Sequence, residues 1–238
     1  MQVRLELGLL QLELDGRPDG LKPEGNESWL EVYRQRQQQH ESQHPDGAPF
    51  QLEPEDCERL LREGIQYYHR YLGFWHLRRY ELCARDTNRN LRLFKFVREH
   101  ARLEQDRRQF DQYRPYVTMM HTRAVATPLV EMNDFTTALG AIDAGIRAIR
   151  DFLEEYRQTE RASRCTELTY LEGWRAEVAA SLPDPQPAPA EPNDLIAQLS
   201  TQLSVAIAQE RFEEAAHLRD EIRRLSASPF RSEGDEKL

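Results

Sequence analysis

Residues 182–193 read Leu-Pro-Asp-Pro-Gln-Pro-Ala-Pro-Ala-Glu-Pro-Asn and hold five prolines. Proline has no amide hydrogen and a fixed φ, so this run can neither continue a helix nor enter the interior of a sheet. Such a segment is typical of an extended, semi-rigid spacer of about 3 Å per residue. We therefore expect a body over residues 1–181, a proline-rich linker over 182–193, a small module over 194–226 and a disordered tail over 227–238.

The composition of the 238 residues favours helices and protein partners. Charged residues make up 31% and hydrophobic residues 39% of the chain, and the mean hydropathy is −0.78. This polar balance suits thin amphipathic helices rather than a thick layered core. The net charge of −9 argues against a molecule that coats nucleic acid or an anionic membrane, so proteins are the expected partners.

The cysteines and the N-terminus indicate a cytoplasmic protein. Cys57, Cys83 and Cys165 are odd in number and far apart, and no C-x-x-C pair occurs. This pattern supports neither a zinc ribbon nor a disulfide framework, so reduced thiols are expected. The N-terminus has no apolar signal-peptide core, and no run of about 18 apolar residues follows. We expect a soluble protein without a membrane contact.

The body is predicted to be mainly α, with a short β element at its start. Residues 2–14 alternate in polarity, and the phase slips at Gly8-Leu9-Leu10, which indicates a bulge or a tight reversal. This strand or hairpin should lie against the helices, because an isolated hairpin is marginal in water.

Helices with short, antiparallel connections should form the rest of the body. The helix that begins at Pro54 should bury a broad apolar face that includes Ile65, Tyr68 and Leu77. The expected helices cover 27–40, Pro54 to Leu82, an N-cap at Asp86-Thr87-Asn88 to Ala101, 116–132, 135–156 and 160–181.

The pair of helices over residues 122–156 resembles a tetratricopeptide helix hairpin. Small residues fall where two helix backbones must approach closely, and large apolar residues fall between them. Pro128 inside the first helix and the lack of a closing proline depart from the repeat pattern. The residues that carry the resemblance are Ala126, Leu129, Phe135, Ala138, Ile142 and Gly145.

Motifs for catalysis are weak or absent in this sequence. His40-Glu41-Ser42-Gln43-His44 has the H-E-x-x-H spelling of zinc peptidases. Pro45 disfavours helical geometry at His44, the surroundings are rich in glutamine, and no third ligand motif follows, so a solvated loop is expected instead. No phosphate-binding glycine loop and no nucleophile elbow occurs. The sequence predicts no catalytic residues, no metal and no cofactor.

A basic strip over residues 75–108 leaves a nucleic-acid hypothesis open. It holds ten Arg/Lys against five Asp/Glu, interleaved with aromatic residues. Arg85, Arg89 and Arg92 share one helical face and could follow a phosphate backbone. The alternative is that these arginines are solvated or paired with neighbouring acids.

The module after the linker predicts two amphipathic helices. Leu195, Leu199, Leu203 and Ile207 form one apolar stripe, and Phe212, Ala215, Leu218, Ile222 and Leu225 form a second. About 30 residues cannot bury a sufficient core of their own. Part of each stripe must therefore dock on a partner or on a second copy. Acidic and basic residues nearly balance here, which suits a protein contact.

Residues 193–226 resemble the UVR motif, the helical hairpin shared by the UvrB and UvrC excision-repair proteins. The resemblance rests on Phe212-Glu213-Glu214-Ala215-Ala216 and Leu218-Arg219-Asp220-Glu221-Ile222. The motif also occurs in some Clp-type chaperone ATPases and in activators of protein arginine kinases. The resemblance implies protein–protein contact, often hairpin against hairpin, and the arrangement resembles bacterial proteins that contain this motif.

The sequence favours a non-enzymatic adaptor over a repair enzyme, because helicase motifs and a nuclease domain are missing. The body would bind one partner, and the hairpin would bind another UVR-containing protein or a second copy. Phe212, Leu218 and Ile222 are the expected docking residues. The alternative is a nucleic-acid-associated repair or stress factor that uses the basic strip.

Overall fold

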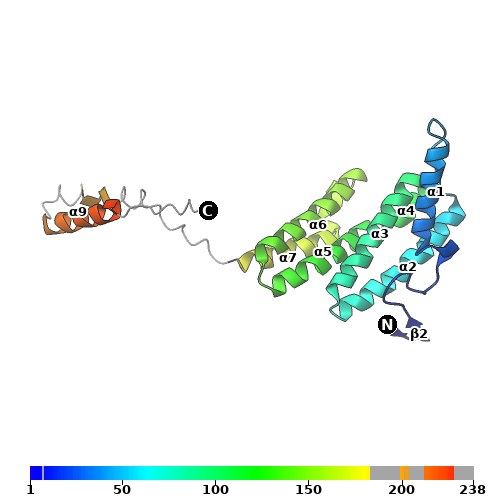
Figure 1. Ribbon diagram of the computed structural model, residues 1–238, viewed down its shortest axis with the longest axis horizontal. Helices are drawn as coiled ribbons and strands as arrows, with labels where there is room; N and C mark the ends of the chain where they lie inside the picture. Colours follow the sequence, from blue (N-terminus) through cyan, green and yellow to red (C-terminus); the bar gives the residue numbers. More distant parts are fainter. Residues whose placement is uncertain (7, 183–198, 201, 204–211, 228–238) are drawn as a thin grey trace, which may run out of the picture. The chain divides into compact units, whose positions relative to one another are not determined.

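The computed structural model describes residues 1–238 except 7, 183–198, 201, 204–211 and 228–238. The chain divides into two compact units, Met1–Leu182 and Pro183–Leu238. The first is called the body below, and the second the C-terminal unit. The described residues are mainly helical, as predicted (Figure 1). The predicted linker and tail lie almost entirely outside them.

A two-stranded antiparallel sheet opens the body, and it confirms the predicted hairpin. Strand β1 (Gln2–Leu5) pairs with β2 (Gly8–Gln11), with Val3 opposite Leu10. The chain reverses between Leu5 and Gly8, just before the phase slip at Gly8-Leu9-Leu10, and the residues of the slip pair within β2 without a bulge. The side chain of Met1 lies directly against Gly73 of the second helix, where a Cβ would come within 2.5 Å of it. The hairpin thus lies on the helical body.

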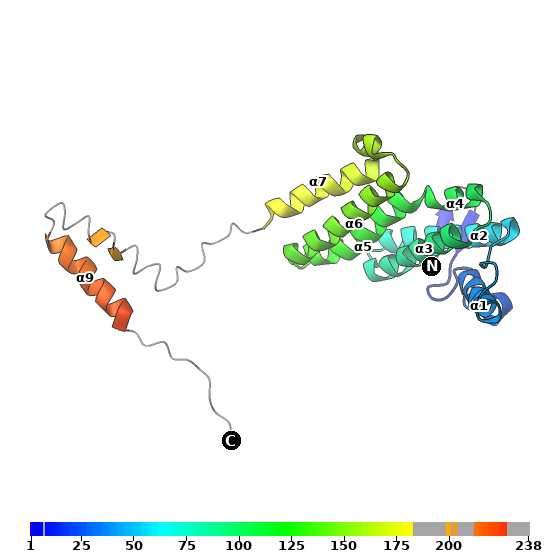
Figure 2. The same cartoon turned by 90° about the horizontal axis from the view of Figure 1, so that it is seen from above.

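Most helices of the body pack against a neighbour in the chain, α2 on α3, α3 on α4, α5 on α6 and α6 on α7, and α5 packs against α3 as well (Figures 1 and 2). Short 3-10 segments lie at Pro23–Gly25 and Thr159–Arg164. The α-helices are α1 (Trp29–Gln43), α2 (Pro54–His76), α3 (Tyr80–His100), α4 (Glu104–Asp111), α5 (Arg114–Glu131), α6 (Phe135–Glu155) and α7 (Thr166–Ala180).

The predicted start of α2 is confirmed, but its predicted end is wrong. A capping box between Glu53 and Asp56 starts the helix at Pro54. The helix ends at His76, and Arg78 takes a left-handed φ of 56° before α3 begins. Asp86-Thr87-Asn88 does not cap a helix but lies inside α3. Asp86 and Thr87 are buried there and use their side chains for tertiary and local hydrogen bonds.

Helices α5 and α6 form the hairpin predicted near residues 122–156. Asn133, with a φ of 61°, makes the turn between them. Ala126 and Ala138 are fully buried, and a Cβ on Gly145 would come within 2.1 Å of the Thr122 Oγ1 atom. The two backbones therefore approach as closely as the small residues suggested. The tetratricopeptide resemblance itself stays a prediction.

Two clusters of buried apolar residues hold the body together. The α5–α7 core gathers residues such as Ile142, Ile149 and Leu171 with Phe74 of α2. The α1–α4 core gathers residues such as Tyr33, Leu60, Leu93, Phe96 and Phe110. Tyr116 packs against both clusters. Because α3 and α5 contribute side chains to both, the clusters are parts of one connected interior.

The thiols of the body behave as small apolar side chains. Cys57 and Cys83 are buried and free, and Cys165 is free and partly buried. Desolvation raises the pKa of Cys57 and of Cys83 to about 12, so both thiols stay protonated near neutral pH.

The prediction that α2 buries Ile65, Tyr68 and Leu77 is wrong. Ile65 is 47% exposed and Leu77 is 61% exposed, and Tyr68 is also open to solvent. Leu77 lies beyond the end of α2. The other two lie on the surface between α2 and α5, where they border a cavity.

Candidate protein-interaction site

Helix α9 (Phe212–Ala227) is the main described element of the C-terminal unit. Glu213 and Glu214 follow its first residue, and Arg224 lies in its last turn. Acids near the N-terminus and bases near the C-terminus complement the helix dipole. The sequence thus favours a helix here, as predicted. Helical backbone also occurs at residues 199–200 and 202–203, within the first predicted helix of the module.

The described residues of the C-terminal unit follow the amphipathic pattern that the sequence predicted. Leu218 and Ile222 are half-buried, whereas the described residues between and after them are exposed. Leu199 and Leu203 are half-buried too, next to exposed Ser200. A spacing of four places each pair on one helical face.

The opposite face of α9 is charged and solvated. His217 Nδ1 lies 3.9 Å from Glu221 Oε2, and Arg219 lies 3.4 Å from Asp220. Exposed pairs of this kind contribute little to stability or affinity. The apolar stripe is therefore the part of this helix whose burial can contribute most to stability.

The structure places only part of the predicted docking set. Leu218 and Ile222 lie on one face of α9. Phe212 and Ala215 belong to the same helix, but their side chains are outside what is described. Ile207 lies outside the described residues altogether. The docking roles of the whole set remain predictions.

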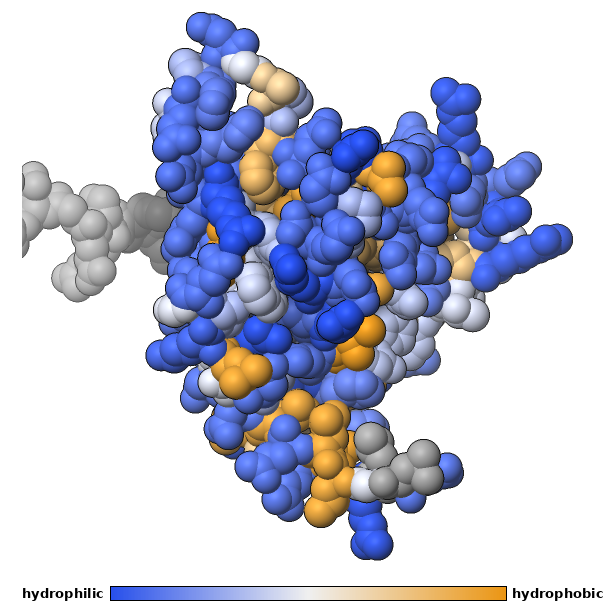
Figure 3. All heavy atoms as spheres, turned by 90° about the vertical axis from the view of Figure 1, so that its right-hand side faces the viewer, coloured by the Kyte–Doolittle hydropathy of each residue, from blue (hydrophilic) through white to orange (hydrophobic). Residues whose placement is uncertain are grey.

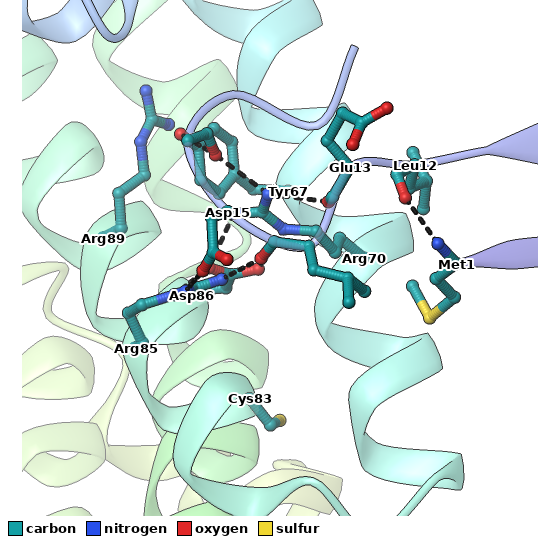
Figure 4. A network of polar contacts seen from close by, with 12 residues as sticks. Met1, Leu12, Glu13, Asp15, Tyr67, Arg70, Cys83, Arg85, Asp86 and Arg89 are labelled. Carbon is teal, nitrogen blue, oxygen red and sulfur yellow. Dashed lines mark hydrogen bonds and ion pairs between the residues drawn. The ribbon is translucent and has the colours of Figure 1, made fainter. Parts of the chain in front are cut away.

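The basic strip on α3 is not the surface that the sequence suggested. Arg89 is buried and pairs with the carboxylate of buried Glu63. Arg85 bonds Asp15 at 2.8 Å and the carbonyl of Leu14 at 2.7 Å (Figure 4). Arg85 is nevertheless exposed, as is Arg92. The prediction that they form one nucleic-acid-binding face is wrong for Arg89, because a buried acid from α2 neutralises it.

Sequence reasoning missed a buried ion network that fixes the N-terminal segment. Arg70 forms a bidentate ion pair with Asp86, with nitrogen–oxygen distances of 2.6 and 2.9 Å. Its remaining nitrogen donates to the carbonyls of Glu13 and Gly16 (Figure 4). The only available signal was a charged residue between two buried tyrosines of α2. Such a position indicates a paired charge but does not identify its partner.

A second part of the same network lies at the start of α1. Buried Glu63 accepts hydrogen bonds from the amides of Trp29 and Leu30. These amides belong to the first turn of the helix, where they have no partner within the helix. Glu63 therefore caps α1 and balances Arg89 at the same time.

The H-E-x-x-H segment is helical for most of its length, so the predicted loop is wrong. His40 lies in the last turn of α1, and His44 follows the helix end. The two rings stack with centroids 4.9 Å apart, and His40 Nε2 lies 2.8 Å from the carbonyl oxygen of Ala48. Within the part of the chain that is described, no three His, Cys, Asp or Glu side chains are grouped as metal ligands.

The comparisons with known proteins concern the C-terminal unit. No curated protein and no solved structure matches the chain. No helix among the described residues is long and apolar enough to cross a membrane. The family model of the UvrB/uvrC motif matches residues 193–228, which include all of α9. The chain thus carries a UvrB/UvrC motif near its C-terminus, as the sequence predicted.

Proposed function

We propose that this protein is a non-enzymatic adaptor whose UVR motif docks on another protein. In UvrB/UvrC-type proteins the motif mediates protein–protein interaction. The observation that carries the proposal is the stripe of Leu218 and Ile222, half-buried between exposed charges within the matched residues. The partner is a second UVR-containing protein or a second copy of this chain, and the protein acts in the cytoplasm.

The small size of the motif supports docking. A helix of 16 residues is marginal in water, and a two-helix module lacks the apolar area for a self-sufficient core. Burying a Leu or Ile side chain completely is worth about 1.5–3 kcal/mol relative to exposure. Covering the part of Leu218 and Ile222 that is still exposed would contribute a fraction of that energy and would stabilise the module and the complex together.

The body is proposed to supply the second contact of the adaptor. The sequence of its α5–α6 hairpin is predicted to resemble a tetratricopeptide unit, and the body bears exposed apolar side chains. Figure 3 shows a largely hydrophilic face on which hydrophobic residues gather at the end that carries the N-terminal hairpin. Leu9 and Leu21 are more than half exposed. The nucleic-acid alternative is not favoured, because Arg89 is buried and Arg85 is paired.

The substitution Ile222→Asp tests the adaptor proposal. A carboxylate on the apolar stripe should weaken association at least about tenfold, because it removes apolar burial and adds a desolvation cost. Sedimentation measures self-association, and capture of UVR-containing proteins of the same cell measures binding to a partner. Circular dichroism should show an unchanged helical body.

The control is Arg223→Asp, which puts the same carboxylate on the exposed face one residue away. It should change association less than about threefold, as expected for an exposed charge. Wild-type-like association of Ile222→Asp would contradict the proposal. An equal loss of association in Ile222→Asp and Arg223→Asp would also contradict it. That result would mean that the added negative charge, and not the loss of an apolar contact, weakens association.

A further inference from the structure

The C-terminal end of α1 brings two histidine rings together. His40 lies in the last turn of the helix and His44 directly follows its end. The two rings stack, with centroids 4.9 Å apart and an angle of 30° between their planes. His44 is exposed and His40 is partly exposed. Two imidazoles at a spacing of four residues share one face of a helix, so a single metal ion can contact both.

A backbone carbonyl determines which nitrogen of each ring carries a hydrogen. His40 Nε2 lies 2.8 Å from the Ala48 carbonyl oxygen, and His44 Nδ1 lies 3.2 Å from the His40 carbonyl oxygen. A carbonyl oxygen can only accept a hydrogen bond, so these two nitrogens are the donors. In the neutral rings, Nδ1 of His40 and Nε2 of His44 therefore hold free lone pairs. Metal-binding histidines commonly donate their other ring hydrogen to a carbonyl in this way.

A tight turn after the helix supplies one of these carbonyls. The Gly47 amide donates to the His44 carbonyl at 3.0 Å, and the chain then returns so that the Ala48 carbonyl meets the His40 ring. A Cβ on Gly47 would lie 2.8 Å from the His44 Cβ atom, so the turn favours glycine. Phe50 also contacts the His40 ring, in a T-shaped arrangement with centroids 6.0 Å apart. The orientation of the His40 ring is thus set by two neighbours.

The ligand set suits a transition metal and not a hard cation. Imidazole nitrogens bind Ni²⁺, Cu²⁺ and Zn²⁺, whereas Mg²⁺ and Ca²⁺ prefer oxygen ligands. Among the residues that the structure describes, no third His, Cys, Asp or Glu completes a group of metal ligands. Glu41 accepts a hydrogen bond from the Gln37 side chain at 2.7 Å on the same helix. The arrangement therefore supports metal binding by two side chains and gives no support for hydrolysis.

We propose that His40 and His44 form a two-histidine site for a divalent transition-metal ion. The ligands are Nδ1 of His40 and Nε2 of His44, and water fills the remaining coordination positions. Metal–nitrogen bonds are about 2.0–2.1 Å long, and the exposed side chain of His44 has room to adjust to that distance. This site goes beyond the adaptor role and does not depend on it, because both ligands belong to the body.

Titration calorimetry of the full chain with Ni²⁺, in protein purified without a histidine tag, tests the proposal. The wild type should bind one Ni²⁺ ion per chain with a saturable isotherm. His44→Gln should weaken the affinity at least about tenfold, because a single imidazole no longer chelates the ion. His40→Gln should do the same. Both side chains lie at the surface, so circular dichroism should show an unchanged helix content.

The matched control is His76→Gln, which removes an exposed histidine of α2 outside the pair. Its Ni²⁺ affinity should stay within about twofold of the wild type. Mn²⁺ should bind the wild type at least about tenfold more weakly than Ni²⁺, because the affinity of nitrogen ligands rises from manganese to nickel.

Absence of saturable Ni²⁺ binding to the wild type would overturn the proposal. An unchanged affinity in His44→Gln would overturn it too. So would an equal loss in His76→Gln and His44→Gln, because that result would mean that nickel binds to surface histidines indiscriminately.

Discussion

At the scale of single residues, the buried pair of Arg70 and Asp86 connects three parts of the body. The two side chains are each 1% exposed, and they join α2 to α3. The same guanidinium holds the carbonyls of Glu13 and Gly16, which belong to the segment after the hairpin. All three nitrogens of the Arg70 guanidinium thus donate hydrogen bonds, two to the Asp86 carboxylate and the third to backbone carbonyls. A buried guanidinium needs such partners, because it has lost its hydration.

We predict that Asp86→Asn destabilises the body by about 3–5 kcal/mol, because it leaves the buried Arg70 without a counter-charge. Urea unfolding followed by circular dichroism measures the change. Hydrogen exchange should also accelerate in the segment over residues 13–16. The control is Glu172→Gln, which breaks an exposed pair with Arg150 and should cost less than about 1 kcal/mol. If Asp86→Asn lowered the free energy of unfolding as little as Glu172→Gln does, the buried pair would have no structural role.

At the scale of elements, the contact between α5 and α6 depends on one glycine. Gly145 faces Thr122, and its missing Cβ leaves room for that side chain. Gly140 lies on the same helix, and nothing lies within 4 Å of its Cβ position. A larger residue at Gly145 would therefore clash with α5. A larger residue at Gly140 would change only the helix propensity of the backbone.

We predict that Gly145→Ala destabilises the body by about 1–3 kcal/mol, since the helices must separate to admit the methyl group. Gly140→Ala should instead stabilise it by up to about 1 kcal/mol through helix propensity. Thermal unfolding of the two variants measures the contrast. Adding Thr122→Gly to Gly145→Ala should relieve the clash. Stabilisation by both alanines would mean that α5 and α6 are not in close contact.

Sequence patterns predicted the elements that are specified locally. The start of α2 at Pro54 and the reversal near Gly8 were correct, because proline and the phase of alternation act over a few residues. Asp86-Thr87-Asn88 was misread as a cap, because its partner Arg70 lies 16 residues earlier. For Arg89 the sequence left open a nucleic-acid contact or a pair with an acid, and it could not identify the acid as Glu63 on α2. Side-chain pairs between helices leave no local signal.

The candidate docking site was predicted better than the cavity. An amphipathic stripe has a helical period, so Leu218 and Ile222 could be found from spacing alone. The cavity that Ile65 and Tyr68 border joins side chains from α2, α3, α4 and α5, and in the sequence these aromatic and aliphatic residues resemble any other core residues. Only the packing of α2 and α5 on α3 creates it.

At the scale of the whole body, the two core clusters share helices α3 and α5 and the ring of Tyr116. Trp29 packs against the α1–α4 core, whereas Trp174 packs against the α5–α7 core. Each tryptophan can therefore report on one cluster. Shared helices couple the two clusters, because unfolding one exposes apolar side chains on which the other depends.

We predict that Leu60→Ala lowers the urea unfolding midpoints measured at Trp29 and at Trp174 by the same amount. Leu60 is fully buried in the α1–α4 core, so its truncation should cost about 2–5 kcal/mol. Fluorescence of two single-tryptophan forms, one with Trp29 and one with Trp174, follows urea unfolding of each cluster. Leu77→Ala, at an exposed position, should move neither midpoint appreciably. If only the Trp29 midpoint moves, α3 does not transmit stability between the clusters.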